Sequence, residues 1–80
     1  MATDTEKLKC ISIGDVVSWR ENSEEVSGPV NGFTLFRRDK LATHHVIVER
    51  EGQKEKTIAL SSIIARRRER GAGSGTVSWR

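Results

Sequence analysis

The chain has 80 residues, of which 35% are apolar and 31% charged, so it has material for one small domain and not for two. Its single cysteine excludes an intramolecular disulfide, and no apolar run resembles a signal sequence or a membrane span, so we expect a cytoplasmic protein with no membrane partner. The net charge of +3 is divided unevenly: residues 1–49 hold six Lys and Arg against eight Asp and Glu, and residues 50–80 hold eight against three. The basic half favours a partner that carries phosphates or an acidic surface.

The chain begins with a polar stretch and then changes to a strand pattern. Residues 1–10 have no period, which predicts a disordered lead-in. From Ile11 onward, apolar residues recur at alternate positions, which is the period of a half-buried strand. After a Gly-Asp turn, this pattern predicts a strand over residues 15–20 that buries Val17 and Trp19.

A second strand is predicted over residues 25–36, although two turn-forming pairs interrupt it. Pro29 cannot donate a hydrogen bond to a neighbouring strand, which favours an edge or a bulge at that point. The pair at 31–32, Asn-Gly, fits either a type I′ hairpin turn or a bend within one long strand. We favour the bend, because the Gly-Pro-Val stretch before it is too short to pair alone.

The later residues predict two more clear strands and one short one. Residues 43–50 alternate, with Val46 and Val48 on one face, and a Gly-containing loop leads to a strand over residues 56–60. Residues 61–65 suit a single 3-10 turn followed by a very short fifth strand.

These elements predict an all-β fold: a small SH3-like barrel of four to five short antiparallel strands, with one 3-10 turn and flexible termini. We expect the barrel domain to cover residues 11–66. Residues 67–80 are expected to form a basic, then Gly- and Ser-rich tail, whose last residues, TVSWR, have the alternation of a terminal strand.

Residues 13–30, IGDVVSWRENSEEVSGPV, resemble the opening of Tudor- and KOW-type SH3-like domains. They are similar to the hypervirulence-associated Tudor-like domain family. Its Gly-Asp-x-Val-x-Trp strand and Val-x-Gly step are matched here by Gly14, Asp15, Val17, Trp19, Val26 and Gly28. The resemblance covers roughly residues 12–65, and it implies a fold of that type rather than a particular activity.

Side chains suited to catalysis, metal binding or methyl-mark recognition are few. Tudor folds that bind methylated Lys or Arg enclose the cation in several aromatic rings. This chain has two Trp, two Phe and no Tyr, and its core needs most of them. His44 and His45 are neighbours on a strand and point to opposite faces, so they cannot hold one ion together. No nucleophile, carboxylate pair or phosphate loop has a catalytic setting, so we expect a protein that is not an enzyme and uses no cofactor and no metal.

Basic residues carry the remaining functional signal, in three groups that lie in turns or follow the last strand. Loops gather at the rims of an SH3-like barrel, so we expect two of these groups to meet, with one exposed aromatic ring beside them to stack on a base. This pattern predicts a non-catalytic binding module that contacts RNA or DNA with little sequence specificity. The predicted nucleic-acid-binding residues are Arg37, Arg38 and Lys40; Arg50, Lys54 and Lys56; Arg66, Arg67, Arg68 and Arg70; and the aromatic Phe36.

The alternative is a protein-interaction module or accessory subunit of a larger complex, which docks on an acidic protein partner by a barrel edge or by its C-terminal strand. Val-Ser-Trp-Arg stands at residues 17–20 and again at residues 77–80, but four residues are too few for a structural repeat. We expect the first copy to be a core strand. The second copy, with Val77 and Trp79 beyond a linker, is expected to be an interaction segment suited to self-association.

Overall fold

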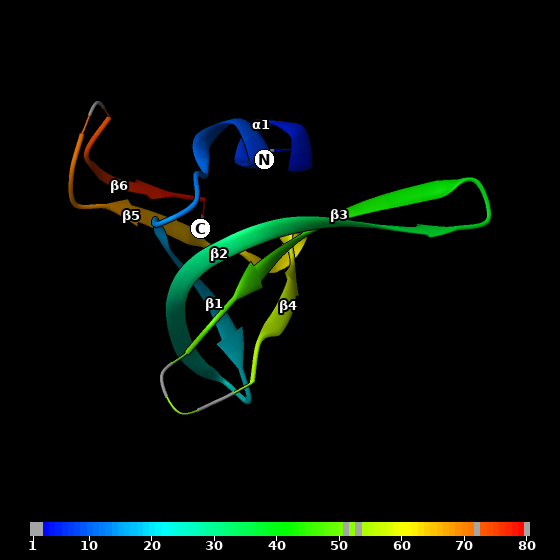
Figure 1. Cartoon of the computed structure of the whole chain (residues 1–80), viewed down its shortest axis with the longest axis horizontal. Coiled ribbons are helices and arrows are strands. Elements are labelled where there is room, and N and C mark those ends of the chain that lie inside the picture. Colours follow the sequence, from blue (N-terminus) through cyan, green and yellow to red (C-terminus); the bar gives the residue numbers. More distant parts are fainter. Residues whose placement is uncertain (1–2, 51, 53, 72, 80) are drawn as a thin grey trace.

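The computed structural model describes residues 3–50, 52, 54–71 and 73–79. Its elements are α1 (Asp4–Cys10), β1 (Val16–Glu21), β2 (Glu24–Arg38), β3 (Leu41–Val48), β4 (Lys56–Ala59), the 3-10 turn η1 (Leu60–Ser62), β5 (Ala65–Arg68) and β6 (Gly75–Ser78). The strands form one antiparallel sheet in the order β4-β3-β2-β1-β5-β6, with β4 and β6 at its edges (Figure 1). The expectation of an antiparallel, sheet-rich fold is therefore confirmed.

β2 is a single long strand that bends and serves two neighbours. Residues 24–29 pair with β1, whereas residues 30–38 pair with β3, and the register with β3 shifts between Val30 and Gly32. In Figure 1 the strand sweeps around the molecule, which lets it belong to both halves of the sheet. The expected bend within one strand is confirmed, and the hairpin turn at this position is not formed.

Gly28 lies where the bent strand passes closest to the core. A β-carbon at this position would overlap Val48 Cγ1 and would lie 3.5 Å from Trp19 Cη2. Both neighbours are buried side chains, so neither can move into solvent to make room. The glycine therefore allows the first half of β2 to lie directly against the core.

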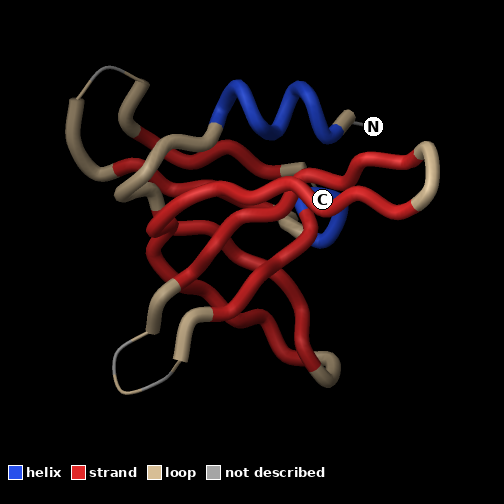
Figure 2. Tube along the Cα trace, turned by 45° about the vertical axis from the view of Figure 1, so that its right-hand side comes forward, coloured by secondary structure: helices blue, strands red, loops and turns tan. Residues whose placement is uncertain are grey.

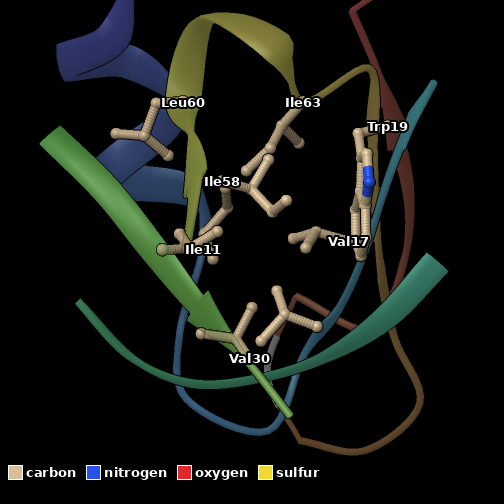
Figure 3. Close-up of a cluster of buried hydrophobic side chains, with 9 residues drawn as sticks. Ile11, Val17, Trp19, Val30, Ile58, Leu60 and Ile63 are labelled. Carbon is tan, nitrogen blue, oxygen red and sulfur yellow. The ribbon is translucent and has the colours of Figure 1, made fainter. Parts of the chain in front are cut away.

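The core consists of apolar side chains that converge from both halves of the sheet and from η1 (Figure 3). Val17 and Trp19 are both almost fully buried on β1, which confirms the inward face predicted for that strand. The residues of this cluster are Ile11, Val17, Trp19, Val30, Val46, Val48, Ile58, Leu60 and Ile63.

The N-terminal stretch forms a helix where a disordered lead-in was predicted. Residues 4–10 are α1, and Thr3 caps its first turn by accepting a hydrogen bond through Oγ1. Lys7 is buried and donates from Nζ to the carbonyl oxygens of Leu60, at 3.0 Å, and Ile63, at 2.9 Å. Seven residues are too few for a stable helix in isolation. The contacts of Lys7 with Leu60 and Ile63 stabilise α1. Residues 4–10 have no apolar periodicity, so the sequence pattern did not predict this helix.

The C-terminal stretch forms two strands, β5 and β6, where a short fifth strand and a flexible tail with a terminal strand pattern were predicted. β5 covers residues 65–68, the arginine run, and overlaps the stretch expected to hold the turn and the fifth strand, residues 61–65, only at Ala65. η1 begins one residue before that stretch. β6 then pairs with β5, from Ala65 opposite Ser78 to Arg68 opposite Gly75. The described sheet therefore has six strands instead of four to five, and β5 continues past residue 66.

Candidate functional site

The far ends of β2 and β3 project from the rest of the molecule as a two-stranded ribbon (Figures 1 and 2). We call this ribbon, residues 33–46, the arm. Its register runs without interruption from Phe33 opposite Val46 at the root to Arg38 opposite Leu41 at the tip. Asp39 in the terminal turn has a φ of 56°, a left-handed conformation that Asp adopts more readily than most residues.

The arm carries most of the exposed large apolar side chains in the described part of the chain. Five such residues are exposed: Ile13 (66%), Phe33 (38%), Leu35 (41%), Phe36 (51%) and Leu41 (76%). All except Ile13 lie on the arm. Exposed apolar side chains that gather in one place mark a binding surface more often than single scattered ones do, so the arm is the first candidate for a contact site.

Cross-strand pairing divides the arm into two faces, because directly opposed residues of an antiparallel pair point to the same side. One face, which we call the Phe36 face, is formed by Thr34, Phe36, Arg38, Leu41, Thr43 and His45. The opposite face, which we call the Val46 face, continues into the core through Val46 and is formed by Phe33, Leu35, Arg37, Ala42, His44 and Val46.

The aromatic ring of Phe36 is held by a neighbour on its own face. Its centroid lies 4.7 Å from that of the His45 ring, and the two planes meet edge to face at 84°. His45 Nδ1 lies 3.2 Å from the carbonyl oxygen of Thr43, within hydrogen-bond distance. The edge-to-face contact stabilises the orientation of the Phe36 ring, and the residue as a whole is 51% exposed.

The tip of the arm is basic. Arg37, Arg38 and Lys40 are all exposed, and within the described ranges none of the three forms an ion pair. Arg37 and Arg38 point to opposite faces because they are neighbours on a strand. Asp39 offsets one of these three positive charges, so the tip keeps a net positive charge. Because Arg37 and Arg38 point to opposite faces, each side of the ribbon carries a cation.

The second predicted group lies at the loop between β3 and β4 and is partly neutralised. Lys56 forms an ion pair with Glu21. Arg50 and Lys54 line an open groove of about 700 Å³ together with Glu49 and backbone and side chains from Pro29 to Asn31. Among the described residues of this region, the acidic side chains Glu49 and Glu21 lie beside the basic ones, so its positive charge is partly offset.

Arg66, from the third predicted group, is buried and has a structural role. Its exposed fraction is 5%, and its Nη1 donates to the carbonyl oxygen of Cys10 at 3.2 Å. Its Nη2 donates to the carbonyl oxygens of Gly73, at 3.4 Å, and Gly75, at 3.3 Å. The guanidinium therefore ties the end of α1 to the loop and strand that follow β5, and it is not available to a phosphate.

Arg68 points to the same side of β5 as Arg66 and forms an ion pair with Asp15. Its Nε donates to Oδ1 and its Nη2 to Oδ2 of the carboxylate, both at 2.9 Å. Asp15 is buried and also accepts from the N–H of Ser12 at 2.8 Å. The Arg68 guanidinium, helped by this N–H, holds the pKa of Asp15 below its ordinary value of 3.8, although burial of the carboxyl opposes the shift.

Arg67 and Arg70 are the two members of the third group that remain exposed. Arg67 lies 3.5 Å from a carboxylate oxygen of Glu69, in a solvent-exposed pair. Both arginines border an open groove of about 450 Å³, whose other wall is the turn at residues 12–16. This short basic edge lies at the end of the molecule opposite to the arm (Figures 1 and 2).

The structure does not bring the three predicted groups together. The arm, the β3–β4 loop and the β5–β6 hairpin project in three different directions in Figure 1. Of the predicted residues, Phe36 and the cations of the arm tip share one element with exposed apolar side chains. The arm is therefore the site that the geometry supports best.

Val77 and Trp79, predicted as an interaction segment, lie against their own chain. Trp79 is half-buried and packs on the hydrophobic core, and Lys7 Nζ lies 5.8 Å from the centroid of its ring. The backbone N–H of Trp79 donates to the carbonyl oxygen of Ile64 at 2.8 Å. Trp79 therefore packs on the core of its own chain, whereas Val77 is half-buried and pairs with Arg66 on β5; a contact of this segment with a partner stays a prediction.

Three exposed apolar residues of the arm and the ring that contacts Phe36 were not among the predicted site residues: Phe33, Leu35, Leu41 and His45. For Phe33 and Leu35 a signal is present, because together with Phe36 they place apolar residues at positions of both parities just before the charged turn. A strand that is apolar on both faces is either buried in a core or exposed to a partner. Sequence pattern alone did not decide between these two cases.

No family model, no curated protein sequence and no solved structure matches this chain. In the ranges that the structure describes, no three or more His, Cys, Asp and Glu side chains are placed so that they could hold a metal ion. Those ranges also contain no helix of the length and apolar character needed to cross a membrane.

Proposed function

We propose that the chain is an SH3-like module of Tudor type. The shared, bent β2, the 3-10 turn between β4 and β5, and the return of β5 to pair with β1 support this assignment. So does the opening strand that resembles Tudor-like domains, with Gly14, Asp15, Val17 and Trp19 at the matching positions. α1 and β6 are additions to that arrangement. The small size of such a fold suits binding rather than catalysis.

We further propose that the module binds nucleic acid through the arm, with little sequence preference. One observation carries this proposal: Arg37, Arg38 and Lys40 lie on the same projecting ribbon as the exposed ring of Phe36. Cations that neutralise phosphates supply most of the affinity in sequence-independent binding, and an aromatic ring adds stacking with any base.

The binding surface is smaller than the sequence predicts. Arg66 and Arg68 hold carbonyl groups and Asp15, and Lys56 pairs with Glu21. If Arg66, Arg68 and Lys56 make no phosphate contacts, the arm is the main cationic element that also has an aromatic group beside it. We therefore expect few phosphate contacts and weak to moderate affinity at physiological salt.

The experiment is a salt titration of binding, measured by fluorescence anisotropy with a labelled oligonucleotide. Neutralising two arm cations, Arg37→Gln with Arg38→Gln, should weaken binding and reduce the slope of log affinity against log salt by about 1 to 2. The matched control is Arg67→Gln with Arg70→Gln, which removes the same charge from an exposed edge at the other end of the molecule. This control should leave the slope close to that of the unmodified protein.

Two results would overturn the proposal. One is no detectable binding of any oligonucleotide at low salt. The other is an equal loss of affinity in the two double variants, which would indicate attraction by net charge without a defined site.

A protein partner is the second candidate function, and the exposed apolar residues of the Val46 face, Phe33 and Leu35, favour it. A pull-down from cell extract with and without nuclease separates the two candidates. A partner that is retained after nuclease treatment, and lost when Phe33 and Leu35 are replaced by Ser, would support protein docking in place of nucleic-acid binding.

A further inference from the structure

The Phe36 face of the arm combines a stacking ring with a cation at a fixed separation. Phe36 and Arg38 are two residues apart on one strand and point to the same side, so their positions along the ribbon differ by about 7 Å. Thr43 stands opposite Phe36, and Thr34 stands opposite His45 on the same face. Their hydroxyl groups can donate and accept hydrogen bonds around the ring.

We infer that this face binds single-stranded nucleic acid, with a base stacked on the ring of Phe36 and the neighbouring phosphate at Arg38. The inference rests on the proposed function, and it specifies the class of nucleic acid and the residue that contacts the base. An unpaired base has its ring face free, and an exposed aromatic ring next to a guanidinium is the arrangement that binds such bases without reading their sequence.

A duplex fits this surface less well for an energetic reason. An apolar ring enters a duplex only by unstacking a base step, which is energetically unfavourable. Proteins that use such wedges recover the cost by wrapping bent DNA around a large cationic surface. Here the surface beyond the arm is not of that kind, because Arg66 and Arg68 are already engaged and Lys56 is paired with Glu21.

The opposite face of the arm provides a matched control. Phe33 is also exposed, at 38%, and lies on the same ribbon, but it points to the Val46 face together with Arg37. Replacing Phe33 by Leu and replacing Phe36 by Leu make the same chemical change on the two faces of one element. Thermal unfolding of both variants establishes that each is folded before binding is compared.

The experiment measures the affinity for oligothymidylate and oligouridylate of about ten nucleotides and for a duplex of the same length. The single strands should bind more tightly than the duplex. Phe36→Leu should weaken single-strand binding about tenfold, in line with the loss of one base stack, and should leave the salt slope unchanged because no charge is removed. Phe33→Leu should change affinity by less than about twofold, and Phe36→Trp should retain or improve binding.

A direct readout of stacking completes the test. An oligonucleotide that carries 2-aminopurine loses fluorescence when its base stacks on an aromatic ring. Quenching should occur with the unmodified protein and with Phe33→Leu, and should disappear with Phe36→Leu.

The outcomes separate this inference from the proposed function. If the arm cations govern the salt slope but the duplex binds as tightly as the single strands, or if the two Phe→Leu variants behave alike, the inference is wrong while the proposed function stands. If no nucleic acid binds at low salt, both are wrong.

Discussion

Val17 and Val77 lie on either side of Arg66 in the sheet, each as its directly opposed partner, one on β1 and the other on β6. The serines that follow them flank Ala65 in the same way. Both strands run antiparallel to β5, so the two copies of Val-Ser-Trp run parallel to each other with one strand between them. Identical letters occupy equivalent sheet positions although the chain contains no structural repeat.

This arrangement changes the interpretation of the second copy. Its Val77 and Trp79 share the inward face of the sheet with Val17 and Trp19 because the parity is the same. The last residue of this copy, Arg80, lies outside the described residues. The second copy therefore belongs to the sheet, as its edge strand β6, and its contact with a partner stays a prediction.

The first prediction concerns Arg66. Replacing it by Gln should lower the free energy of unfolding by about 1–3 kcal/mol, because the buried Arg66 side chain loses its charge-assisted hydrogen bonds to the carbonyl groups of Cys10, Gly73 and Gly75. Arg67→Gln is the control on the same strand, and its exposed side chain should contribute within about 0.5 kcal/mol. Urea denaturation measures both. Equal stability of the two variants would contradict a structural role of Arg66 in joining α1 to the β5–β6 hairpin.

The second prediction concerns pH. The pKa of Asp15 is lowered in the folded protein, so its contribution to stability is fully present above the ordinary value of about 3.8 and is lost as the pH falls through the lowered pKa. Asp15→Asn should be less stable than the unmodified protein at neutral pH, and the difference should shrink below about pH 4. Thermal unfolding from pH 7 to pH 2 measures the difference, and a difference that does not change with pH would refute the prediction.

The third prediction compares two glycines of β2. Gly28→Ala should destabilise the fold by about 1–3 kcal/mol, because the new methyl group overlaps Val48 Cγ1 in a packed core. At Gly32 the nearest atom to an added β-carbon is Ile47 Cδ1 at 3.7 Å, an ordinary contact. Gly32→Ala should therefore be neutral or slightly stabilising. Chemical denaturation of both variants decides, and a comparable loss in each would count against the steric explanation.

The fourth prediction concerns Trp79. Trp79→Ala should lower the free energy of unfolding by about 1–3 kcal/mol, because the ring packs on the core and faces the Lys7 ammonium group. We expect the mass in solution, measured by sedimentation equilibrium, to stay that of the unmodified protein. A dimer that dissociates only in the variant would restore the C-terminal segment as a self-association site.

The strands were predictable where apolar residues alternate with polar ones, as at residues 15–20, or where a turn pair could be excluded by length, as at residues 31–32. The apolar pattern did not predict α1 or β5, because hydrogen bonds from charged side chains stabilise both elements. Lys7 and Arg66 donate to carbonyl groups that lie more than 50 positions away along the chain. A local pattern contains no information about such acceptors, so a buried Lys or Arg has the same appearance in the sequence as a solvated one.

The candidate site was predictable in part for a related reason. Exposed Arg37, Arg38 and Phe36 lie where a charged turn follows a strand, which a pattern can detect. The division of the arginine run into a buried Arg66, an engaged Arg68 and an exposed Arg67 depends on which side of β5 each residue points to. That alternation follows once the run is known to be a strand, but the density of positive charge in ARRRER favours a solvated tail.

The contacts of Lys7 and Arg66 also determine how the molecule opens. Lys7 joins α1 to η1 and lies over Trp79, and Arg66 joins α1 to the β5–β6 hairpin. The two terminal segments should therefore unfold together as one cooperative unit. In native-state hydrogen exchange, the amide of Lys7, bonded to Thr3, and that of Trp79, bonded to Ile64, should report the same opening free energy. Residues 35–44 of the arm, which pair only with one another, should exchange sooner and change shape at little cost to the rest of the sheet.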